Sequence, residues 1–515
     1  GPIKRDKLFF NVSGRHFSND GHLYGRSVFE PEDVGVDPTG RLDVLNAGGS
    51  GDSSFVSMNP YQKSSGQAKL TWKQGNFKVA LTGIGSTESF NGGRGIQEMT
   101  FMPEWRRNEQ KDAFTTFLKL THTLSATTFY ELGITRSKTE FDSALFDDPF
   151  DARYQDNTYI DFTDGINTSN FRVGGTDNGR FSRSTETYLV KWDLTSQFSK
   201  RNMVKAGIEF RKHDLNFLDE FTAVFPVGDE LVQAQVNNGE YNRKPTEASA
   251  YIQDKIEFEG LIVNIGLRWD YFNSDGPVLL DETDPNIVFE ERRQDLEQNQ
   301  IFKDSNAKSQ ISPRLGVSFP ISEGGVVHFS YGWFFQIPNF NLLYQNPYFR
   351  LGTSGSGLIG LIGNANLRPQ KTINGEIGLK QSLSNSTGVE ITAFFRDIND
   401  LAGTATDPIL IAGTSARYGK FVNSDFGFVR GIILRFDQRI ASDFSVNLDY
   451  TFQVAKGNAS DPAAVFNAAQ AKQEREQQIV PLDWDQTHTA NISMTYSNQE
   501  QNWGFGIISS FGSGL

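Results

Sequence analysis

Hydrophobic and polar residues alternate with a period of two along many segments of this chain. From Val204 to Phe210 every second residue is apolar, and the residues between them are Lys, Gly and Glu. The same division runs through 261–271, 444–453 and 488–496. A helix would place both kinds of residue on mixed faces. The pattern therefore predicts β-strands that have one apolar face and one polar face.

Short polar turns join these strands in pairs. Gly, Asn, Asp and Ser, which suit tight hairpins, place the turns at 74–76, 125–126, 199–201, 259–260, 321–325, 384–387, 441–443 and 498–501. Long polar stretches separate the pairs, at 18–65, 84–113, 137–186, 213–245, 272–310, 336–371, 398–426 and 454–486. Strict alternation of short turns and long loops is typical of a transmembrane β-barrel with short periplasmic turns and long extracellular loops.

The predicted fold is therefore all-β, an antiparallel transmembrane β-barrel. Closure of the sheet is required because an open edge in lipid would leave backbone groups without hydrogen-bond partners. We count about 17 strands, the first of which runs from Leu8 to Phe17. The odd count and the finish at Leu515 predict that further strands lie outside this sequence. One long loop should contain a short helix within Ala463–Gln478, because Asp461 and Pro462 form a favourable helix start.

The composition favours a barrel wall that is one residue thick, with one apolar and one hydrated face, over the hydrophobic core of a soluble protein. Hydrophobic residues make up only 37% of the chain, yet aromatic residues reach 13% and Phe occurs 43 times. The absence of Cys excludes disulfide scaffolds, zinc ribbons and thiol catalysis. The net charge of −13, without a basic stripe, argues against a nucleic-acid partner. No apolar run is long enough for a transmembrane helix, but a membrane-spanning strand alternates its faces and escapes that test.

Several segments resemble TonB-dependent outer-membrane receptors. These are Ile311–Phe319 with Val327–Trp333, Gly363–Lys371 before a strand, and Asp483–His488 before another strand. The opening Lys7–Ser13 resembles the subgroup whose N-terminal extension is a carboxypeptidase-regulatory-like domain. The resemblance covers essentially the whole chain. It implies a barrel of about 22 strands that holds an N-terminal plug and is opened by the TonB energy-coupling complex.

The ends of the chain depart from that family's pattern. No plug, no TonB box and no closing strand with a terminal aromatic residue is recognised. The residues Gly1–Lys7 contain no apolar segment typical of a secretory signal. We therefore interpret 1–515 as one partial barrel domain, with the plug, the N-terminal extension and the closing strands outside this sequence.

Residue types that could support catalysis are dispersed. The six histidines have no useful metal-ligand spacing; they are His16, His22, His122, His213, His328 and His488. No Ser-His-Asp order, paired catalytic carboxylates or nucleophile elbow is found, so we predict that the protein is not an enzyme. The glycine-rich segment 352–363 lacks the Lys-Ser/Thr ending of a phosphate-binding loop, which favours a flexible loop tip.

Two acidic runs are candidates for binding calcium. They consist of Asp142, Asp147, Asp148, Asp151, Asp156, Asp161 and Asp164, and of Asp281, Glu282, Asp284, Glu290, Glu291, Asp295 and Glu297. Neither fits the twelve-residue EF-hand pattern, so solvated loop charge is the favoured interpretation. We predict no cofactor, with calcium in these loops as the alternative.

Two groups of residues are candidates for contact with a ligand. The aromatic-rich stretch 333–350 fits either an interfacial girdle or a ligand-facing surface above the lumen. The ligand-facing interpretation uses Phe340, Asn341, Tyr344, Tyr348 and Arg350. The residues predicted to line a polar lumen are Lys205, Glu209, Arg211, Asn264, Arg268, Asp270, Arg435, Asp437 and Arg439.

The function predicted from these patterns and from the resemblance is uptake of a ligand through a barrel in the bacterial outer membrane. The ligand would be a glycan, a peptide or a siderophore. The partners would be outer-membrane lipid and, through a plug, the TonB energy-coupling complex. A passive outer-membrane channel is the first alternative, and a surface adhesin without a pore is the second.

Overall fold

The computed structural model describes residues 1–515 except 37–41, 45, 47, 92–96, 156–170, 228–229, 286–300, 347–355, 441–442, 474–477, 499–500 and 514–515. The described residues are nearly all β, with 68% strand and 4% helix, which confirms the predicted fold class. Among the described residues, none of the helices combines the length and the apolar character needed to cross a membrane. The chain divides into two compact units. Unit 1 comprises Gly1–His122, Leu132–Val190 and Arg211–Lys244, and unit 2 comprises Thr123–Glu131, Lys191–Phe210 and Pro245–Leu515.

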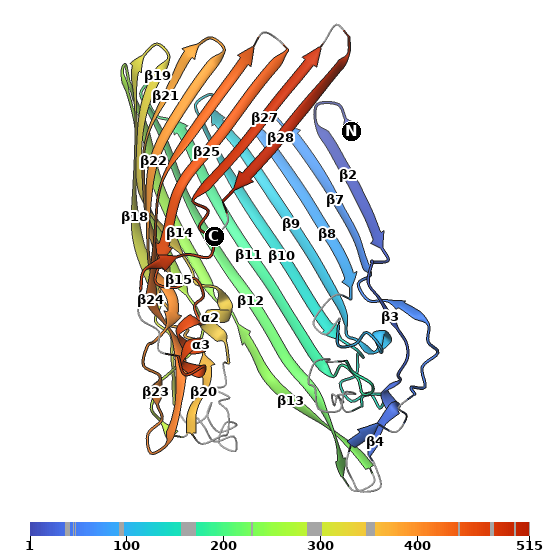
Figure 1. Ribbon diagram of the computed structural model, residues 1–515. Coiled ribbons are helices and arrows are strands. Elements are labelled where there is room, and N and C mark those ends of the chain that lie inside the picture. Colours follow the sequence, from blue (N-terminus) through green and yellow to red (C-terminus); the bar gives the residue numbers. More distant parts are fainter. Residues whose placement is uncertain are drawn as a thin grey trace. The chain divides into compact units, whose positions relative to one another are not determined.

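Unit 1 is built on long antiparallel strands (Figure 1). They are β2 (Leu8–Asn19), β7 (Tyr61–Gln74), β8 (Phe77–Phe90), β13 (Glu230–Arg243) and the parts within unit 1 of β9 (Asn108–Ser125), β10 (Thr128–Ala144), β11 (Gly179–Gln197) and β12 (Asn202–Val227). β1 (Pro2–Lys4) pairs with β2, and antiparallel ladders then join β2 to β7, β7 to β8, β8 to β9 and β12 to β13. The long connections carry the short pairs β3 (Tyr24–Arg26) with β6 (Phe55–Ser57), and β4 (Val34–Val36) with β5 (Leu42–Val44).

Unit 2 contains ten further long strands, each antiparallel to the next. They are β14 (Thr246–Phe258), β15 (Leu261–Asn273), β18 (Lys308–Ser322), β19 (Gly325–Gln336), β21 (Gln370–Ser384), β22 (Thr387–Thr404), β24 (Ser415–Ile440), β25 (Phe444–Gly457), β27 (His488–Asn498) and β28 (Trp503–Gly512). The long connections hold β16 (Pro277–Leu279), β17 (Phe302–Asp304), α2 (Phe340–Tyr344), β20 (Ser356–Ile362), β23 (Ile409–Leu410), α3 (Ala464–Gln470) and β26 (Val480–Pro481). In Figure 1 the labelled members of this set (α2, α3, β20 and β23) lie at the long-loop end of the strands of unit 2.

The order of strands and turns confirms the period-two interpretation. Every predicted short turn separates two long strands, and after the first long connection each further one follows such a pair. The described residues contain eighteen strands of ten residues or more, one more than the predicted number, because β13 lies in a predicted loop. The first of them, β2, begins at Leu8 as predicted.

Two of the predicted loops are largely strand. Most of 213–245 forms the outer half of β12 and the strand β13, whose ladder runs from the Leu215–Arg243 pair to the Val227–Glu230 pair. Most of 398–426 belongs to the ends of β22 and β24. Hairpin pairing needs only backbone groups. Alternation of apolar side chains therefore marks only the part of each strand that has an apolar face, and the predicted strand ends at these loops were wrong.

Two smaller predictions about the loops had different outcomes. The helix expected within 463–478 is confirmed as α3, although it ends at Gln470. The Asp461 side chain accepts a hydrogen bond from the Ala463 amide at 2.9 Å, one turn before this helix. The flexible tip expected at 352–363 was wrong for 356–362, which forms β20 and pairs in parallel with β24. The remainder, 352–355, lies outside the described residues.

A small core holds the long connections of unit 1 together. Phe29, Met99, Met102 and Val173 are buried against one another. Beside this cluster the Trp105 indole donates a hydrogen bond to the Glu30 carboxylate at 3.0 Å. Burial nevertheless raises the pKa of Glu30 above its usual value. These connections therefore have a packed interior of their own rather than being irregular polar chain.

Candidate functional site

One face of the sheet in unit 2 is polar. Arg435 of β24 lies opposite Glu390 of β22 and opposite Asp449 of β25. The guanidinium is 3.1 Å from the Asp449 carboxylate and 3.7 Å from that of Glu390. Asp437 and Arg439 follow at alternate positions of β24, so the three residues predicted for a polar lumen on this strand share one face.

The opposite face of this sheet is apolar and exposed, as residues of β15 and β21 show. Ile265 and Leu267 of β15 are 52% and 53% exposed, and Ile377 of β21 is 56% exposed. Burying a large aliphatic side chain is worth about 1.5–3 kcal/mol. A face of many such side chains would be strongly unfavourable in water, so this face fits a hydrocarbon environment.

The polar face of unit 2 contains a hollow of about 560 Å³, which we call the Arg314 hollow. Its basic lining residues are Lys191, Lys205, Arg268 and Arg314. Neutral polar and apolar residues line it as well, among them Tyr251, Gln253, Asn264, Ser330, Asn374, Ile252, Leu267 and Leu315. The hollow was not predicted from the sequence as a site, although Lys205, Asn264 and Arg268 were each predicted to face a lumen.

Glycines at paired positions create this hollow. Arg314 of β18 lies opposite Gly266 of β15 on one side and opposite Gly332 of β19 on the other. Gly316, two positions along β18, lies in the same way between Asn264 and Ser330. A residue without a side chain leaves the space above its backbone open. The Arg314 side chain is therefore flanked by glycine backbone on both neighbouring strands. Its guanidinium carbon lies over the Phe334 ring, 4.8 Å from the ring centre.

The other predicted lumen residues lie beside this hollow or on the same strands. Arg268 donates from Nε to the Asp270 carboxylate at 2.8 Å, and Asp270 is only 6% exposed. Glu209 and Arg211 alternate with Lys205 along β12 and so project from the same side of that strand. The strand registers thus place the residues predicted to line a lumen on polar faces. That these faces line a lumen stays a prediction.

Unit 1 carries a continuous row of aromatic rings, which we call the aromatic row. Each ring lies 5.0–6.3 Å from the next, measured between ring centres, which is contact distance for aromatic pairs. In order the row consists of Phe17, Tyr61, Phe90, Phe141, Phe181, Phe217 and Tyr241.

The aromatic row lies on the polar face of unit 1. Tyr61 pairs with Phe90 across β7 and β8, and two residues further along the Lys63–Glu88 pair follows on the same face. The Lys63 ammonium is 2.7 Å from the Glu88 carboxylate, and the Tyr61 hydroxyl donates to the same carboxylate at 3.2 Å. Sequence reasoning missed this row because its members belong to different strands. The available signal was an aromatic residue among the polar-face positions of several successive strands.

The residues predicted to contact a ligand are only partly described. Phe340, Asn341 and Tyr344 form α2, whereas Tyr348 and Arg350 lie outside the described residues. Tyr344 is 2% exposed, and its hydroxyl donates to the Ser274 carbonyl oxygen. Its ring stacks on Phe340 at 6.1 Å. Tyr344 therefore packs inside the loop, and ligand contact by Phe340 and Asn341 stays a prediction.

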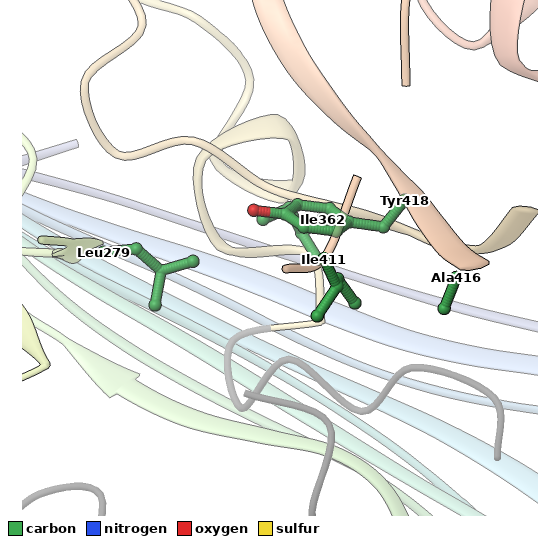
Figure 2. Packing of buried hydrophobic residues seen from close by; sticks show 5 residues of the cluster. All are labelled: Leu279, Ile362, Ile411, Ala416 and Tyr418. Carbon is green, nitrogen blue, oxygen red and sulfur yellow. The ribbon is translucent and has the colours of Figure 1, made fainter. Parts of the chain in front are cut away.

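A buried cluster ties three long loops of unit 2 together, and we call it the loop core. It contains Leu279, Ile362, Ile411, Ala416 and Tyr418. Figure 2 shows the Tyr418 ring against Ile362, with Ile411 alongside. The Tyr418 hydroxyl donates to the backbone carbonyl of Glu282 at 2.6 Å. Burial raises the pKa of Tyr418, which keeps the hydroxyl protonated and able to donate.

Several of the described carboxylates of the acidic runs have protein partners. Hydrogen bonds from Arg153 lower the pKa of Asp151 to about 2. Asp281 accepts from the Thr283 amide at 2.8 Å, and Glu282 pairs with Lys420. Asp156, Asp161, Asp164, Glu290, Glu291, Asp295 and Glu297 lie outside the described residues. Within the described part of the chain no three His, Cys, Asp or Glu residues are grouped to hold a metal ion.

Three histidine rings meet hydroxyl groups at hydrogen-bond distance. His16 is 3.0 Å from the Ser64 hydroxyl, and His213 is 2.9 Å from that of Thr187. His488 is 2.8 Å from the Tyr450 hydroxyl. Hydrogen bonds to hydroxyl groups account for the positions of these three rings.

Comparison with known proteins relates this geometry to a family. Residues 30–515 match the family described as TonB dependent receptor-like, beta-barrel. No curated protein sequence matches the chain.

Solved structures of transporters resemble the chain in fold. The outer membrane transporter YddB from Escherichia coli has a TM-score of 0.64 and 12% identity, over 98% of this chain and 61% of YddB. The siderophore receptor PirA from Acinetobacter baumannii has a TM-score of 0.60 and 15% identity, over 97% of this chain and 62% of PirA. The FrpB iron transporter (F3-3 variant) from Neisseria meningitidis has a TM-score of 0.58 and 14% identity, over 98% of this chain and 65% of FrpB. The chain therefore spans less than two thirds of the length of each of these proteins.

Proposed function

The chain belongs to the family of TonB dependent receptor-like β-barrels, and from this premise we propose that it takes up a ligand across the outer membrane under the control of TonB. Membership of the family, together with the outer membrane transporters that share its fold, places the chain in the bacterial outer membrane. Proteins of this family are transporters rather than enzymes, in agreement with the sequence-based prediction. Because the chain spans only part of such transporters, the plug, the contact with TonB and the ligand belong to the proposal.

The observation that carries this proposal is the contrast between the two faces of each strand. Exposed side chains such as Ile265 and Leu267 suit the lipid acyl chains. The opposite face carries ion pairs, the Arg314 hollow and the aromatic row. A polar face of this kind offers a hydrated ligand hydrogen bonds and stacking surfaces along its path.

The ligand we propose is too scarce or too large for simple diffusion. PirA is a siderophore receptor and FrpB is an iron transporter, so a siderophore-type chelate is the first candidate. Glycans and peptides are the alternatives. The aromatic row suits all three, because planar catechols, sugar faces and aromatic side chains each stack on aromatic rings.

Uptake by a deletion strain tests the proposal directly. A strain that lacks the gene, and the same strain with the gene restored, would be grown with iron chelates, oligosaccharides or peptides as the limiting nutrient. We expect one nutrient class to support growth only when the gene is restored, and this growth to disappear when TonB is removed. Growth that survives the loss of TonB would instead establish the passive channel, and open-channel current across a planar bilayer would support that result.

The aromatic row gives a residue-level test of the same function. Phe141→Ala removes one ring from the row, and we expect about a tenfold weaker apparent affinity for the transported ligand. Phe114→Ala is the matched control, because that ring is 53% exposed on the apolar face of β9. Both affinities would be measured as the ligand concentration that gives half-maximal uptake. Equal effects of the two substitutions would remove the aromatic row from the ligand path.

A further inference from the structure

We propose that the apolar face of unit 2 ends in a docking surface for the phosphorylated sugar headgroup of an outer-leaflet glycolipid. We call this surface the basic border. Its charged and aromatic members are Lys371, Asp397, Arg430, Lys456, Trp333, Phe395 and Phe428. The proposal rests on the location of the chain in the outer membrane and not on uptake, so lipid binding can be measured without any transported ligand.

The strand registers arrange this face in rows that change character abruptly. Strands β19, β21, β22, β24 and β25 lie side by side in unit 2 (Figure 1). One row across them is entirely apolar and consists of Phe329, Ile377, Ala393, Ile432 and Phe452. The next two rows toward the long loops contain Tyr331, Phe395 and Arg430, and then Trp333, Asp397, Phe428 and Lys456. Charged residues therefore begin along one line of the sheet, where the apolar face ends.

Aromatic rings hold two of the basic groups at this line. The Lys371 ammonium lies 3.7 Å from the centre of the Trp333 ring. The Arg430 guanidinium carbon lies 5.4 Å from the centre of the Phe395 ring and 5.6 Å from that of Phe428. Aromatic residues together with long basic side chains are typical of the interface between acyl chains and lipid headgroups.

The basic border carries more positive than negative charge. Arg430 lies 2.8 Å from the Asp397 carboxylate, so these two residues balance each other. Among the residues that the structure describes, neither Lys371 nor Lys456 lies within ion-pair distance of a carboxylate. Two positive charges thus stay unbalanced in a chain whose net charge is −13. A phosphate attached to acyl chains on the apolar face would meet these charges.

A phosphate carried by a sugar suits this surface better than the phosphate of a simple phospholipid. Tyr331 and Phe335 lie on either side of Trp333 along β19 and can pack against a sugar ring. The exposed Asn399 amide, opposite Lys371 in the ladder of β21 and β22, can bond sugar hydroxyl groups.

The position of the basic border selects the leaflet. It lies toward the long loops, which face outside the cell in a barrel of this kind, so the lipid belongs to the outer leaflet. It also lies on the apolar face, so a plug that packs against the polar face would leave it uncovered.

Native mass spectrometry of the purified protein in detergent tests the basic border, with lipid A, the phosphorylated glycolipid anchor of lipopolysaccharide, as the probe. We expect lipid A to bind, and lipid A without its phosphates to bind at least about tenfold more weakly. Lys371→Gln and Lys456→Gln should each weaken binding of lipid A about fivefold, because each removes one positive charge beside the headgroup. Lys380→Gln is the matched control, because Lys380 is an exposed lysine on the polar face of the same strand as Lys371. We expect that control to stay within about twofold of the wild type.

The folding of each variant would be checked by heat-modifiable gel migration. Equal affinity for lipid A and for its dephosphorylated form would overturn the proposal, as would equal losses in Lys371→Gln and Lys380→Gln. Phosphatidylglycerol carries a phosphate without a phosphorylated sugar, and binding of this lipid as tight as that of lipid A would reject the glycolipid as the partner. Lipid A binding by a protein that takes up no nutrient would support the basic border and reject the proposed function.

Discussion

Replacing Tyr418 with alanine is expected to destabilise the loop core by about 3–5 kcal/mol, the usual cost of removing a large buried aromatic ring. The Tyr418 side chain is fully buried among Ile362, Ile411 and Leu279. Its removal leaves a cavity and also leaves the Glu282 carbonyl without its donor. The measurement is native-state hydrogen exchange of the amides in 279–283 and 409–418, which should open far more often in the variant.

The matched control for this change is Tyr418→Phe. It keeps the ring in the loop core and removes only the hydroxyl that donates to Glu282. The expected cost is about 1 kcal/mol, the usual net value of one hydrogen bond. If the alanine and phenylalanine variants exchanged at the same rate, packing of the ring would not be what holds these three loops together.

The loop core matters for function because it fixes the long connections at the end of the strands in unit 2. Loops that bind ligands need a defined shape, and a hydrophobic core formed by the loops themselves is one way to provide it. We therefore expect the alanine variant to keep its strand ladders while its loops lose protection. Loss of protection throughout β14–β28 would contradict this view, since it would make the loop core part of one cooperative unit with the sheet.

The strands of this chain could be predicted because their causes are local. Alternation at 261–271 records the two environments on either side of β15, and each is visible in the identity of single residues. Turn residues such as Gly75 can be recognised by residue type, because glycine readily adopts the positive φ that a tight turn needs. Gly75 adopts a φ of +55°. The turn at Asp461 and Pro462 likewise precedes helix α3, although the helix begins two residues after Pro462. No long-range information was needed for these elements.

The candidate sites required information that one sequence does not carry. The Arg314 hollow depends on Gly266 lying opposite Arg314, although a long connection separates them along the chain. A shift of one residue in that ladder would bring Arg314 opposite a residue that faces the other way. The aromatic row depends in the same way on the registers of many strands. Residue identities could therefore predict a polar face, but not which side chains of different strands lie next to one another on that face.

Tyr344 shows a second limit of prediction from the sequence: one residue type can fit two different environments. An aromatic residue in a polar loop fits both a ligand surface and a loop interior, and composition does not distinguish them. The deciding facts are its 2% exposure and its hydrogen bond to the Ser274 carbonyl, a residue that is distant in sequence. Packing between loops is therefore the information that the sequence-based interpretation of 333–350 lacked.

The apolar face of β15 gives the second large prediction. Ile265→Arg places a charge where the side chain is 52% exposed on that face, and we expect the folded state to lose about 2–4 kcal/mol in a lipid bilayer. Ile265 lies near the middle of β15, where the bilayer would be most costly for an arginine. Urea unfolding in liposomes, followed by heat-modifiable gel migration, measures the change.

Asn264→Arg is the matched comparison for Ile265→Arg, because the same residue is introduced on the other face of the same strand. Asn264 is the adjacent residue, is also exposed, and by the alternation of β15 projects from the polar face, on the opposite side from Ile265. An arginine there remains in a polar setting, although it adds a positive charge beside Lys205 and Arg314, so we expect the folded state to lose no more than about 1 kcal/mol. Two neighbouring positions that receive the same residue would then differ only in the face on which it lies. Equal stability of the two variants would show that the exposed apolar face does not contact lipid, and the proposal of uptake across a membrane would lose its physical basis.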